Sequence, residues 1–360
     1  MNNISDSKEE LCRQFVECNN YPKYILGRNP FAQSVLQVFS SKRFTINGIV
    51  DEFTTDEFFG GVPIVHSISK LSADAIVLSA ALLNPVTVKR KLCGAGVRNI
   101  DYFSLLHFYP EFPIKQICFW EGFHNSFANR HNEYEAIYEC LADKKSKDIY
   151  NRIIDFRLNY NIDAMDIFSD RQKEQYFEPF LNLSAGFSFV DIGGFDGYTT
   201  KQFIEVCPNY NNIWFFEPEE HNLVVAKELL KEHPQITYCQ VAASDKVTEL
   251  RFEPSNDASK ITENGSVTVK AQLIDNIIPQ DSKNLFIKMD IEGAESQAIA
   301  GAVKTIRNCH PTMAISVYHK GADFIDIPKQ IFSIRDDYNI YLRHYTEGIS
   351  ETIMFFVPKG

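Results

Sequence analysis

Short apolar runs alternate with amphipathic stretches along most of this chain. After a polar leader, the first part shows apolar runs of strand length between segments with helical spacing of apolar residues. Such alternation is typical of a parallel sheet covered by helices. The expected elements are the strands 24–27, 44–50, 62–65, 75–78 and 97–102 and the helices 31–39 and 85–92. They predict a small Rossmann-like domain over residues 1–106.

The strand pattern is lost over residues 107–185. Apolar residues recur there at helical spacing within 132–141, 144–158 and 169–180. We expect a helical connector in this region.

The alternation resumes more clearly over residues 186–360. The expected elements are the strands 187–192, 213–217, 236–243, 285–290 and 313–318 and the helices 199–206, 219–231, 294–307 and 328–335. A polar stretch with Gly265 separates the third strand from the fourth. Two final apolar runs, 340–345 and 351–357, predict an antiparallel hairpin that closes the sheet. The fold class is therefore α/β, with two Rossmann-like units joined by a helical connector.

Length and charge narrow the functional classes. A chain of 360 residues accommodates two domains. The net charge is −11 and the Lys and Arg residues are scattered, which argues against nucleic acid as a partner. The N-terminus does not resemble a signal peptide, and no apolar run could span a membrane, so we expect a cytoplasmic protein. The eight cysteines lack metal-ligand spacing and are expected to be reduced and mostly buried.

Ligands of open α/β sheets bind beyond the carboxyl ends of the strands, where the first C-terminal strand runs into a glycine loop. Two acids in this loop, Asp191 and Asp196, disfavour the pyrophosphate of a dinucleotide, and the GxGxxG spacing is missing. S-adenosylmethionine carries an ammonium and a sulfonium but no phosphate, so it suits an acidic loop better. The loop residues expected at this cofactor are Asp191, Gly193, Asp196, Gly197 and Tyr198.

The next three strand ends also carry polar or small residues. Glu217, followed by Pro218, stands where an acid takes the ribose hydroxyls of a bound adenosine. The third strand ends in Ala243, Ser244 and Asp245, which suit an adenine ring with polar groups at its edge. The fourth ends in a cluster of carboxylates that begins at Asp290.

The order of these motifs resembles the FkbM family of S-adenosylmethionine-dependent methyltransferases. The matching segments are FVDIGGFDGYTT (189–200), WFFEPEEHN (214–222), VAASD (241–245), IKMDIEGAE (287–295), ISVYHK (315–320) and IYLRHY (340–345). The segment QYF (175–177) resembles the approach to the cofactor loop in sugar-directed members, which adds Tyr176 to the cofactor residues. One departure is Gly194, where alanine is frequent; we expect it to increase backbone freedom without changing the chemistry.

The resemblance implies a seven-stranded methyltransferase sheet and O-methyltransferase activity, often in capsule, lipopolysaccharide or other glycan biosynthesis. The expected substrate is a sugar or nucleotide-sugar, and a homodimer is left open. A sugar hydroxyl is a poor nucleophile, so a base should assist. Asp290 and His319 follow neighbouring strands, and either could be that base. Glu292, Lys320 and His344 are expected to contact the substrate. Asp290 and Glu292, with a sugar diol, could also hold Mg²⁺, because this ion prefers oxygen ligands.

Two alternatives belong to other functional classes. A nicotinamide-dependent oxidoreductase requires a pyrophosphate loop, and neither unit has a good one. In the first unit, Pro30 and Phe31 crowd the corresponding loop, although Asp51 stands where a ribose-binding acid would be. A non-catalytic glycan-assembly scaffold would keep the fold without turnover.

Overall fold

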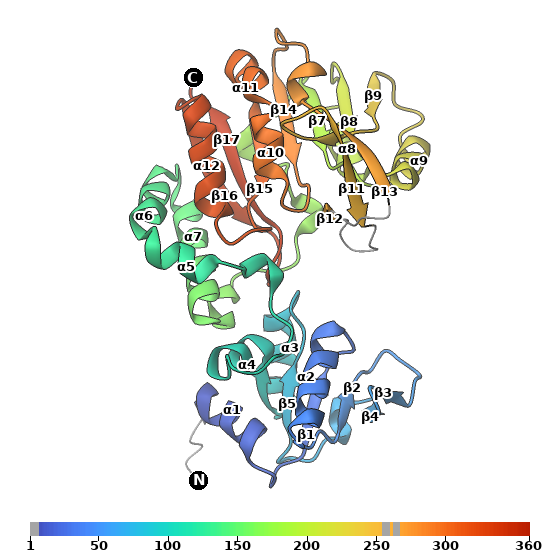
Figure 1. The fold of residues 1–360 in the computed structure, drawn as a ribbon, viewed down its shortest axis with the longest axis vertical. Coiled ribbons are helices and arrows are strands. Elements are labelled where there is room, and N and C mark those ends of the chain that lie inside the picture. The colour runs from blue at the N-terminus through green and yellow to red at the C-terminus, as the bar shows by residue number, and fades with distance from the viewer. Residues whose placement is uncertain (1–6, 254–259, 262–266) are drawn as a thin grey trace. The chain divides into compact units, whose positions relative to one another are not determined.

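The computed structural model of the protein describes residues 7–253, 260–261 and 267–360 and divides into two compact units (Figure 1). The N-terminal unit comprises the residues up to 118 together with 151–171 and 345–350. The C-terminal unit comprises residues 119–150, 172–344 and 351–360. The expected connector, residues 107–185, is thereby shared between the two units.

The N-terminal unit contains a six-stranded sheet in the order β3-β4-β2-β1-β5-β6. Its pairs are parallel except for β3 with β4. The strands are β1 (Lys23–Leu26), β2 (Gly48–Val50), β3 (Phe58–Phe59), β4 (Val62–Val65), β5 (Ile76–Ser79) and β6 (Arg98–Asp101). All four residues of β5 are buried, as expected of an inner strand covered on both faces. The Rossmann-like prediction is confirmed for this unit.

Its helices begin at recognisable caps. They are α1 (Lys8–Glu17), α2 (Pro30–Ser41), α3 (Pro85–Gly94) and α4 (Tyr102–Phe108). Helix α1 lies in the stretch that the sequence presents as a polar leader, and Ser7 caps it by accepting from Glu10 N. At α3 the cap comes from a distant residue, because the Glu347 carboxylate accepts from Thr87 N (2.7 Å) and Thr87 Oγ1 (2.5 Å). This contact ties residues 345–350 to the N-terminal unit.

The C-terminal unit is built on a seven-stranded sheet in the order β16-β17-β15-β14-β7-β8-β9. The strands are β7 (Ser188–Ile192), β8 (Ile213–Phe216), β9 (Ile236–Cys239), β14 (Leu285–Met289), β15 (Thr312–Ser316), β16 (Tyr338–His344) and β17 (Thr352–Pro358). The pairs from β9 to β15 are parallel, and β16 and β17 form the expected antiparallel hairpin. The predicted sheet is therefore confirmed, and chain order reverses between β7 and β14, where a ligand crevice is expected.

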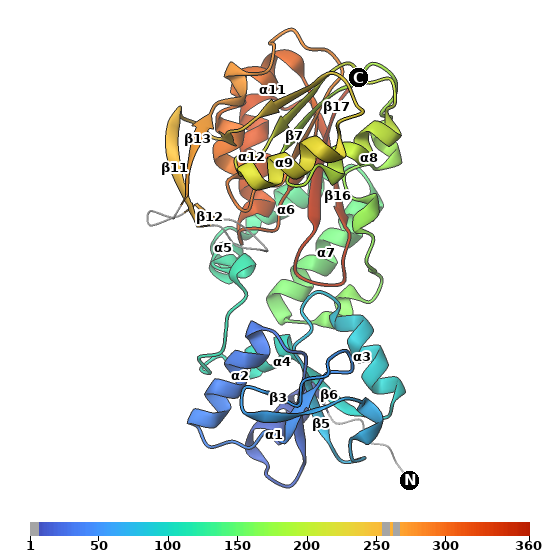
Figure 2. The ribbon, with the colours of Figure 1, turned by 90° about the vertical axis from the view of Figure 1, so that its right-hand side faces the viewer.

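Helices cover both faces of this sheet. They are α8 (Tyr198–Val206), α9 (Glu220–Leu229), α10 (Glu295–Ala300), α11 (Val303–Cys309) and α12 (Asp323–Ile334). Helices α10, α11 and α12 lie on one face and α8 on the other (Figures 1 and 2). The single helix expected over 294–307 is divided, because a Cβ at Gly301 would lie 2.0 Å from the Ser244 carbonyl oxygen. None of the described helices is long and apolar enough to cross a membrane.

The expected connector helices are partly present. Helices α5 (Phe123–Asn129), α6 (His131–Cys140) and α7 (Lys144–Asn159) form, and Arg130 at the start of α6 pairs with Asp326 of α12 (2.6 Å). The helix expected over 169–180 is wrong. Only the 3-10 turns Gln172–Glu174 and Pro179–Leu181 form there, since Tyr176 adopts a left-handed backbone with φ +72° and Pro179 lacks an N–H donor. Four further 3-10 turns span Ile68–Lys70, Cys118–Trp120, Ile162–Met165 and Ile274–Asn276.

A second sheet of the same unit was not predicted. It joins β10 (Ala242–Ala243), β11 (Thr248–Glu253), β12 (Lys260–Ile261) and β13 (Val267–Gln272) in the order β10-β13-β11-β12. The strand expected over 236–243 is therefore divided between two sheets. Gly265, within the expected polar stretch, lies outside the described residues. All eight cysteines are free, but only Cys12, Cys207 and Cys309 are buried, fewer than we expected.

Candidate functional site

The glycine loop after β7 is held by close backbone packing. Gly193 has a φ of +81°, and a Cβ there would lie 2.0 Å from the carbonyl oxygen of Asp290. Gly197, with a φ of +86°, packs against Ala226 of α9. A Cβ at Gly194 would lie 2.2 Å from the Phe215 ring, so this glycine makes room for an aromatic side chain. This is the structural reason for the departure at residue 194, which we had expected to affect backbone freedom alone.

Asp191 supports this loop from the interior of the unit. Its side chain is fully buried (0% exposed), and its Oδ1 lies 3.1 Å from Lys288 Nζ on the neighbouring strand. Asp191 Oδ2 accepts from Thr200 Oγ1 (2.7 Å), and Lys288 Nζ donates to Gly193 O (2.6 Å). In this conformation the fully buried carboxylate presents no surface to a ligand, and its contacts hold the loop. Asp191 instead orients the loop.

The other loop residues lie near the surface. Asp196 accepts from Tyr198 N at the start of α8 (3.0 Å). Phe195 and Tyr198 are 57% and 47% exposed, which is unusual for aromatic side chains and leaves them open to a ligand.

Glu217 lies directly beyond β8 and joins the two neighbouring loops. It is 5% exposed, its Oε2 accepts from Phe195 N (3.0 Å), and its Oε1 accepts from Glu219 N (2.9 Å) and Asn222 Nδ2 (3.4 Å). Burial raises the pKa of this carboxyl group, although the backbone donors oppose the shift. A carboxylate oxygen accepts about two hydrogen bonds, so Oε2 can accept one more.

Four further residues expected at the cofactor lie at the ends of β8 and β10, namely Pro218, Ala243, Ser244 and Asp245. Pro218 is partly buried, Ala243 and Ser244 are buried, and Asp245 is exposed. Ser244 N donates to Gln272 O (2.9 Å) in the second sheet, and Ser244 Oγ lies 3.3 Å from Asp245 Oδ1. The small residues thus pack inward and leave the Asp245 carboxylate at the surface.

Asp290 and His319 meet at the carboxyl ends of β14 and β15. Asp290 Oδ1 lies 3.4 Å from His319 Nε2, and Asp290 Oδ2 accepts from the Tyr176 hydroxyl (2.5 Å). The Asp290 side chain is 19% exposed and that of His319 is 1% exposed. Both predicted catalytic residues therefore lie in one cluster with Tyr176. Tyr176, which was expected at the cofactor, contacts the Asp290 carboxylate.

Carboxylates face both nitrogens of the His319 ring. Glu295 Oε1 lies 2.9 Å from Nδ1, and Glu292 Oε2 lies 3.6 Å from Nε2. Burial lowers the pKa of His319, but the hydrogen bond with Glu295 and the charges of Asp290, Glu295 and Glu292 outweigh burial and raise the pKa to about 9. The cluster is therefore strongly acidic around one buried imidazole.

Several members of this region were not predicted as site residues. Glu351 is partly buried, accepts from Gln175 Nε2 (2.6 Å), and has its pKa raised to about 7 by burial and by the charge of Asp290. Burial and the Asp290 charge also raise the pKa of Tyr318. Glu295 ends the motif IKMDIEGAE, so the motif was a usable signal. Glu351 carries no such signal, because it lies outside every matching segment, whereas Gln175 begins the segment QYF.

The three expected substrate residues divide into two groups. Glu292 faces His319, and the exposed Lys320 lies beside Gly293 in the same loop region. His344 is 2% exposed, and its Nδ1 lies 2.9 Å from Thr352 Oγ1 across the β16–β17 ladder. His344 is therefore part of the hairpin core, which does not suit a substrate contact.

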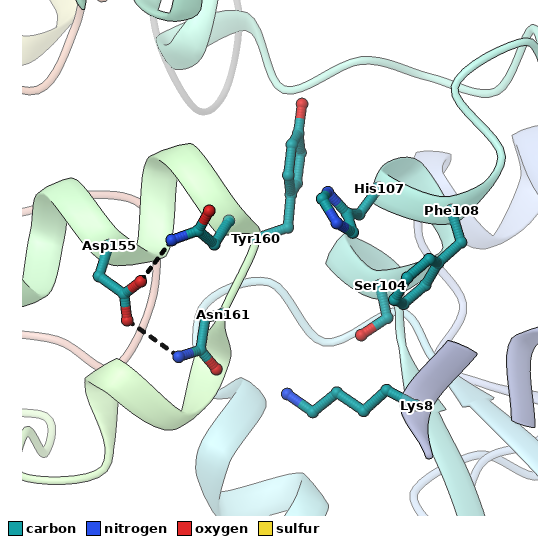
Figure 3. A pocket seen from close by; sticks show the side chains of 8 residues that line it. Lys8, Ser104, His107, Phe108, Asp155, Tyr160 and Asn161 are labelled. Carbon is teal, nitrogen blue, oxygen red and sulfur yellow. Dashed lines mark hydrogen bonds between the residues drawn. The ribbon is translucent and has the colours of Figure 1, made fainter. Parts of the chain in front are cut away.

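The N-terminal unit has a separate pocket of about 270 Å³ (Figure 3). It is lined by Lys8, Ser104, His107, Phe108, Asp155, Asn159, Tyr160 and Asn161. The Asp155 carboxylate accepts from Asn159 (2.6 Å) and Asn161 (2.9 Å). None of the predicted site residues lines this pocket. At the Rossmann-like loop, Arg28 pairs with Asp51 (2.7 Å), so Asp51 already has a cationic partner.

Comparison with known protein families gives one match. The methyltransferase FkbM domain model matches residues 191–345. A comparison with curated proteins gives no match.

Among solved structures, the methyltransferase FkbM from Methylobacillus flagellatus KT is similar with a TM-score of 0.78 and 22% identity, covering 98% of this chain and 93% of that chain. Two further structures match in part. Fibrillarin from Aeropyrum pernix with bound S-adenosyl-L-methionine has a TM-score of 0.33 and 12% identity, covering 52% of this chain and 71% of that chain. A precorrin-6y C5,15-methyltransferase from Geobacter metallireducens GS-15 has a TM-score of 0.32 and 13% identity, covering 54% of this chain and 95% of that chain. The likeness to the first protein is one of fold. The family model identifies residues 191–345 as a methyltransferase FkbM domain.

Proposed function

We propose that the protein is an S-adenosylmethionine-dependent O-methyltransferase that acts on a sugar hydroxyl in glycan biosynthesis. The observation that carries the proposal is that two groups lie at the carboxyl ends of adjacent strands of one sheet. Glu217 and the glycine loop lie on the side of β7 and β8, and Asp290 and His319 lie on the side of β14 and β15.

The cofactor would occupy the first side. The remaining acceptor capacity of Glu217 Oε2 suits one ribose hydroxyl, and the exposed Asp245 carboxylate suits the amino group of adenine. The methionine part of the cofactor would face four residues of the glycine loop, namely Gly193, Asp196, Gly197 and Tyr198. Asp191 would act from beneath the loop, through Lys288.

The acceptor would occupy the second side. Its hydroxyl oxygen forms a bond to the methyl carbon, the carbon–sulfur bond breaks with its electron pair left on sulfur, and the hydroxyl proton passes to a base. Asp290 is the better base on geometry, because its side chain is 19% exposed and that of His319 is 1% exposed. Positioning supplies most of the rate, and the base adds roughly 10²–10⁴-fold.

The oxidoreductase alternative is less compatible with the described loops. In the C-terminal unit, Phe195 N already donates to Glu217, so this backbone donor is not available to a pyrophosphate. In the N-terminal unit, Asn29 Oδ1 accepts from Phe31 N and Ala32 N, which are the first donors of α2. A phosphate would need such donors.

The test is a screen of nucleotide-activated sugars with S-adenosylmethionine, in which each product is examined for a mass gain of one methyl group. Calorimetry with S-adenosylhomocysteine and NAD separates a methyltransferase from an oxidoreductase. Cofactor binding without turnover on any sugar would support a non-catalytic scaffold.

A further inference from the structure

His319 is held as a metal-binding histidine would be. Its Nδ1 lies 2.9 Å from Glu295 Oε1, and Glu295 Oε1 also accepts from Ile291 N (3.0 Å) and Gly293 N (3.4 Å). Glu295 is 1% exposed and cannot turn away without losing these donors. A carboxylate that accepts from one ring nitrogen fixes the tautomer and orients the other nitrogen toward a metal.

The second nitrogen is buried without a hydrogen-bond partner. Nε2 of His319 makes no hydrogen bond within the described part of the chain, and the side chain is 1% exposed. The nearest acidic atoms, Asp290 Oδ1 at 3.4 Å and Glu292 Oε2 at 3.6 Å, flank it. Leaving a buried polar atom unsatisfied costs about 1–3 kcal/mol, so this nitrogen needs a partner.

The spacing suits a cation between these atoms. Ligand bonds of about 2.0–2.2 Å at angles of about 110° place two ligand atoms about 3.3–3.6 Å apart. The separations from Nε2 to Asp290 Oδ1 and to Glu292 Oε2 each agree with this range, so either carboxylate could share an ion with His319. Glu295 lies close by as well, since ligand atoms of Asp290, Glu295 and His319 are all within 4.8 Å of one another. Glu295 Oε1 already has three donors and orients the ring, whereas Glu295 Oε2 is buried and makes no hydrogen bond within the described residues.

We propose that His319 Nε2 and Asp290 bind a first-row divalent metal ion, with Glu295 as the positioning residue behind the imidazole. A nitrogen ligand beside a carboxylate favours Mn²⁺ or Zn²⁺ over Mg²⁺, which prefers oxygen ligands alone. This changes the metal expected from the sequence and adds His319 to its ligands.

The role of the ion in methyl transfer rests on the proposed function, but its binding does not. A cation at this place would hold the acceptor hydroxyl oxygen and lower its pKa. Asp290 would then hold the ion, and a weaker base would suffice.

Metal binding by the full-length protein tests the proposal directly. After treatment with EDTA and dialysis, Mn²⁺ is titrated in, and free Mn²⁺ is followed by electron paramagnetic resonance. We expect saturable binding of one ion, with a directly bound nitrogen visible in the pulsed spectrum. His319→Gln should abolish the nitrogen signal and weaken binding at least about tenfold, and Glu295→Gln should weaken it about 10–100-fold while the nitrogen signal remains.

The matched control is His131→Gln, because His131 is an exposed histidine beside a carboxylate, with Nε2 3.2 Å from Glu135 Oε1. This variant should bind Mn²⁺ as the wild type does. Asp290→Asn, at a side chain that is 19% exposed, provides a second ligand variant if His319→Gln does not fold. Absence of Mn²⁺ binding, binding of Mg²⁺ alone, or a nitrogen signal that survives in His319→Gln would overturn the proposal. Calorimetry with S-adenosylhomocysteine is measured in parallel, so that failure of the metal site is distinguished from failure of cofactor binding.

Discussion

Lys288 and Asp191 form a buried ion pair between the two central strands, with Lys288 Nζ 3.1 Å from Asp191 Oδ1. Lys288 also donates to the Gly193 carbonyl oxygen, so the pair connects the sheet to the glycine loop. Removing one member leaves the other charge buried without compensation, which is more costly than removing both.

We therefore expect Lys288→Met to lower the free energy of unfolding by about 3–5 kcal/mol. The double variant Asp191→Asn/Lys288→Met should recover much of this loss. Urea denaturation measures both, with the exposed Lys283→Met as control. If the double variant is as unstable as the single one, the ion pair is not the source of the effect.

Glu217 should determine cofactor affinity. Glu217→Ala removes the remaining acceptor at Oε2 as well as the anchor of Phe195 N. A lost hydrogen bond to a charged group costs about 1.5–3 kcal/mol, so the dissociation constant of S-adenosylhomocysteine should rise at least about tenfold. Calorimetry checks this, with Glu220→Ala, an exposed acid on α9, as control. Unchanged affinity in Glu217→Ala would show that the ribose binds elsewhere.

Substitution of Asp290 should lower the turnover rate more than the cofactor affinity. Asp290→Asn keeps the size of the side chain and an acceptor for the Tyr176 hydroxyl, but it removes the carboxylate that acts as the base or holds the ion. We expect the turnover rate on the sugar acceptor to fall at least about 10²-fold with nearly unchanged affinity for S-adenosylhomocysteine. Asp281→Asn, at an exposed position before β14, is the matched control. A variant of Asp290 with full activity would exclude this residue as the base.

Asp323 should make stability depend on pH. Burial and the charge of Glu295 raise its pKa from 3.8 to about 7, although Lys320 N donates to it and the charges of His319 and Lys320 oppose the shift. The folded state therefore holds a proton that the unfolded state releases above about pH 4. This contribution to stability is complete below that pH and is lost as the pH rises through about 7.

Asp323→Asn stays neutral at every pH and escapes this loss. Relative to the wild type, its free energy of unfolding should gain about 2 kcal/mol between pH 5 and pH 8. Urea denaturation at the two pH values measures the difference, and Asp281→Asn should follow the wild type. A constant difference between Asp323→Asn and the wild type would contradict the assignment.

The C-terminal sheet was predictable because its inner strands are continuous apolar runs that end in polar residues. The same pattern located Glu217, Asp290 and His319 at neighbouring strand ends. The break at Gly301 and the left-handed Tyr176 were not predictable, because both depend on tertiary packing. The burial of Asp191 was missed for a related reason. Its partner Lys288 lies on a strand that is adjacent in space but distant in sequence.

The most direct measurement is methyl transfer itself. The protein is incubated with S-adenosylmethionine labelled at its methyl group and with a panel of nucleotide-activated sugars, and the products are analysed by mass spectrometry. We expect the label on the oxygen of one sugar, release of S-adenosylhomocysteine in equal amount, and loss of both in Asp290→Asn. Binding of NAD in place of S-adenosylhomocysteine, or label on a nitrogen or carbon atom of the product, would contradict an O-methyltransferase.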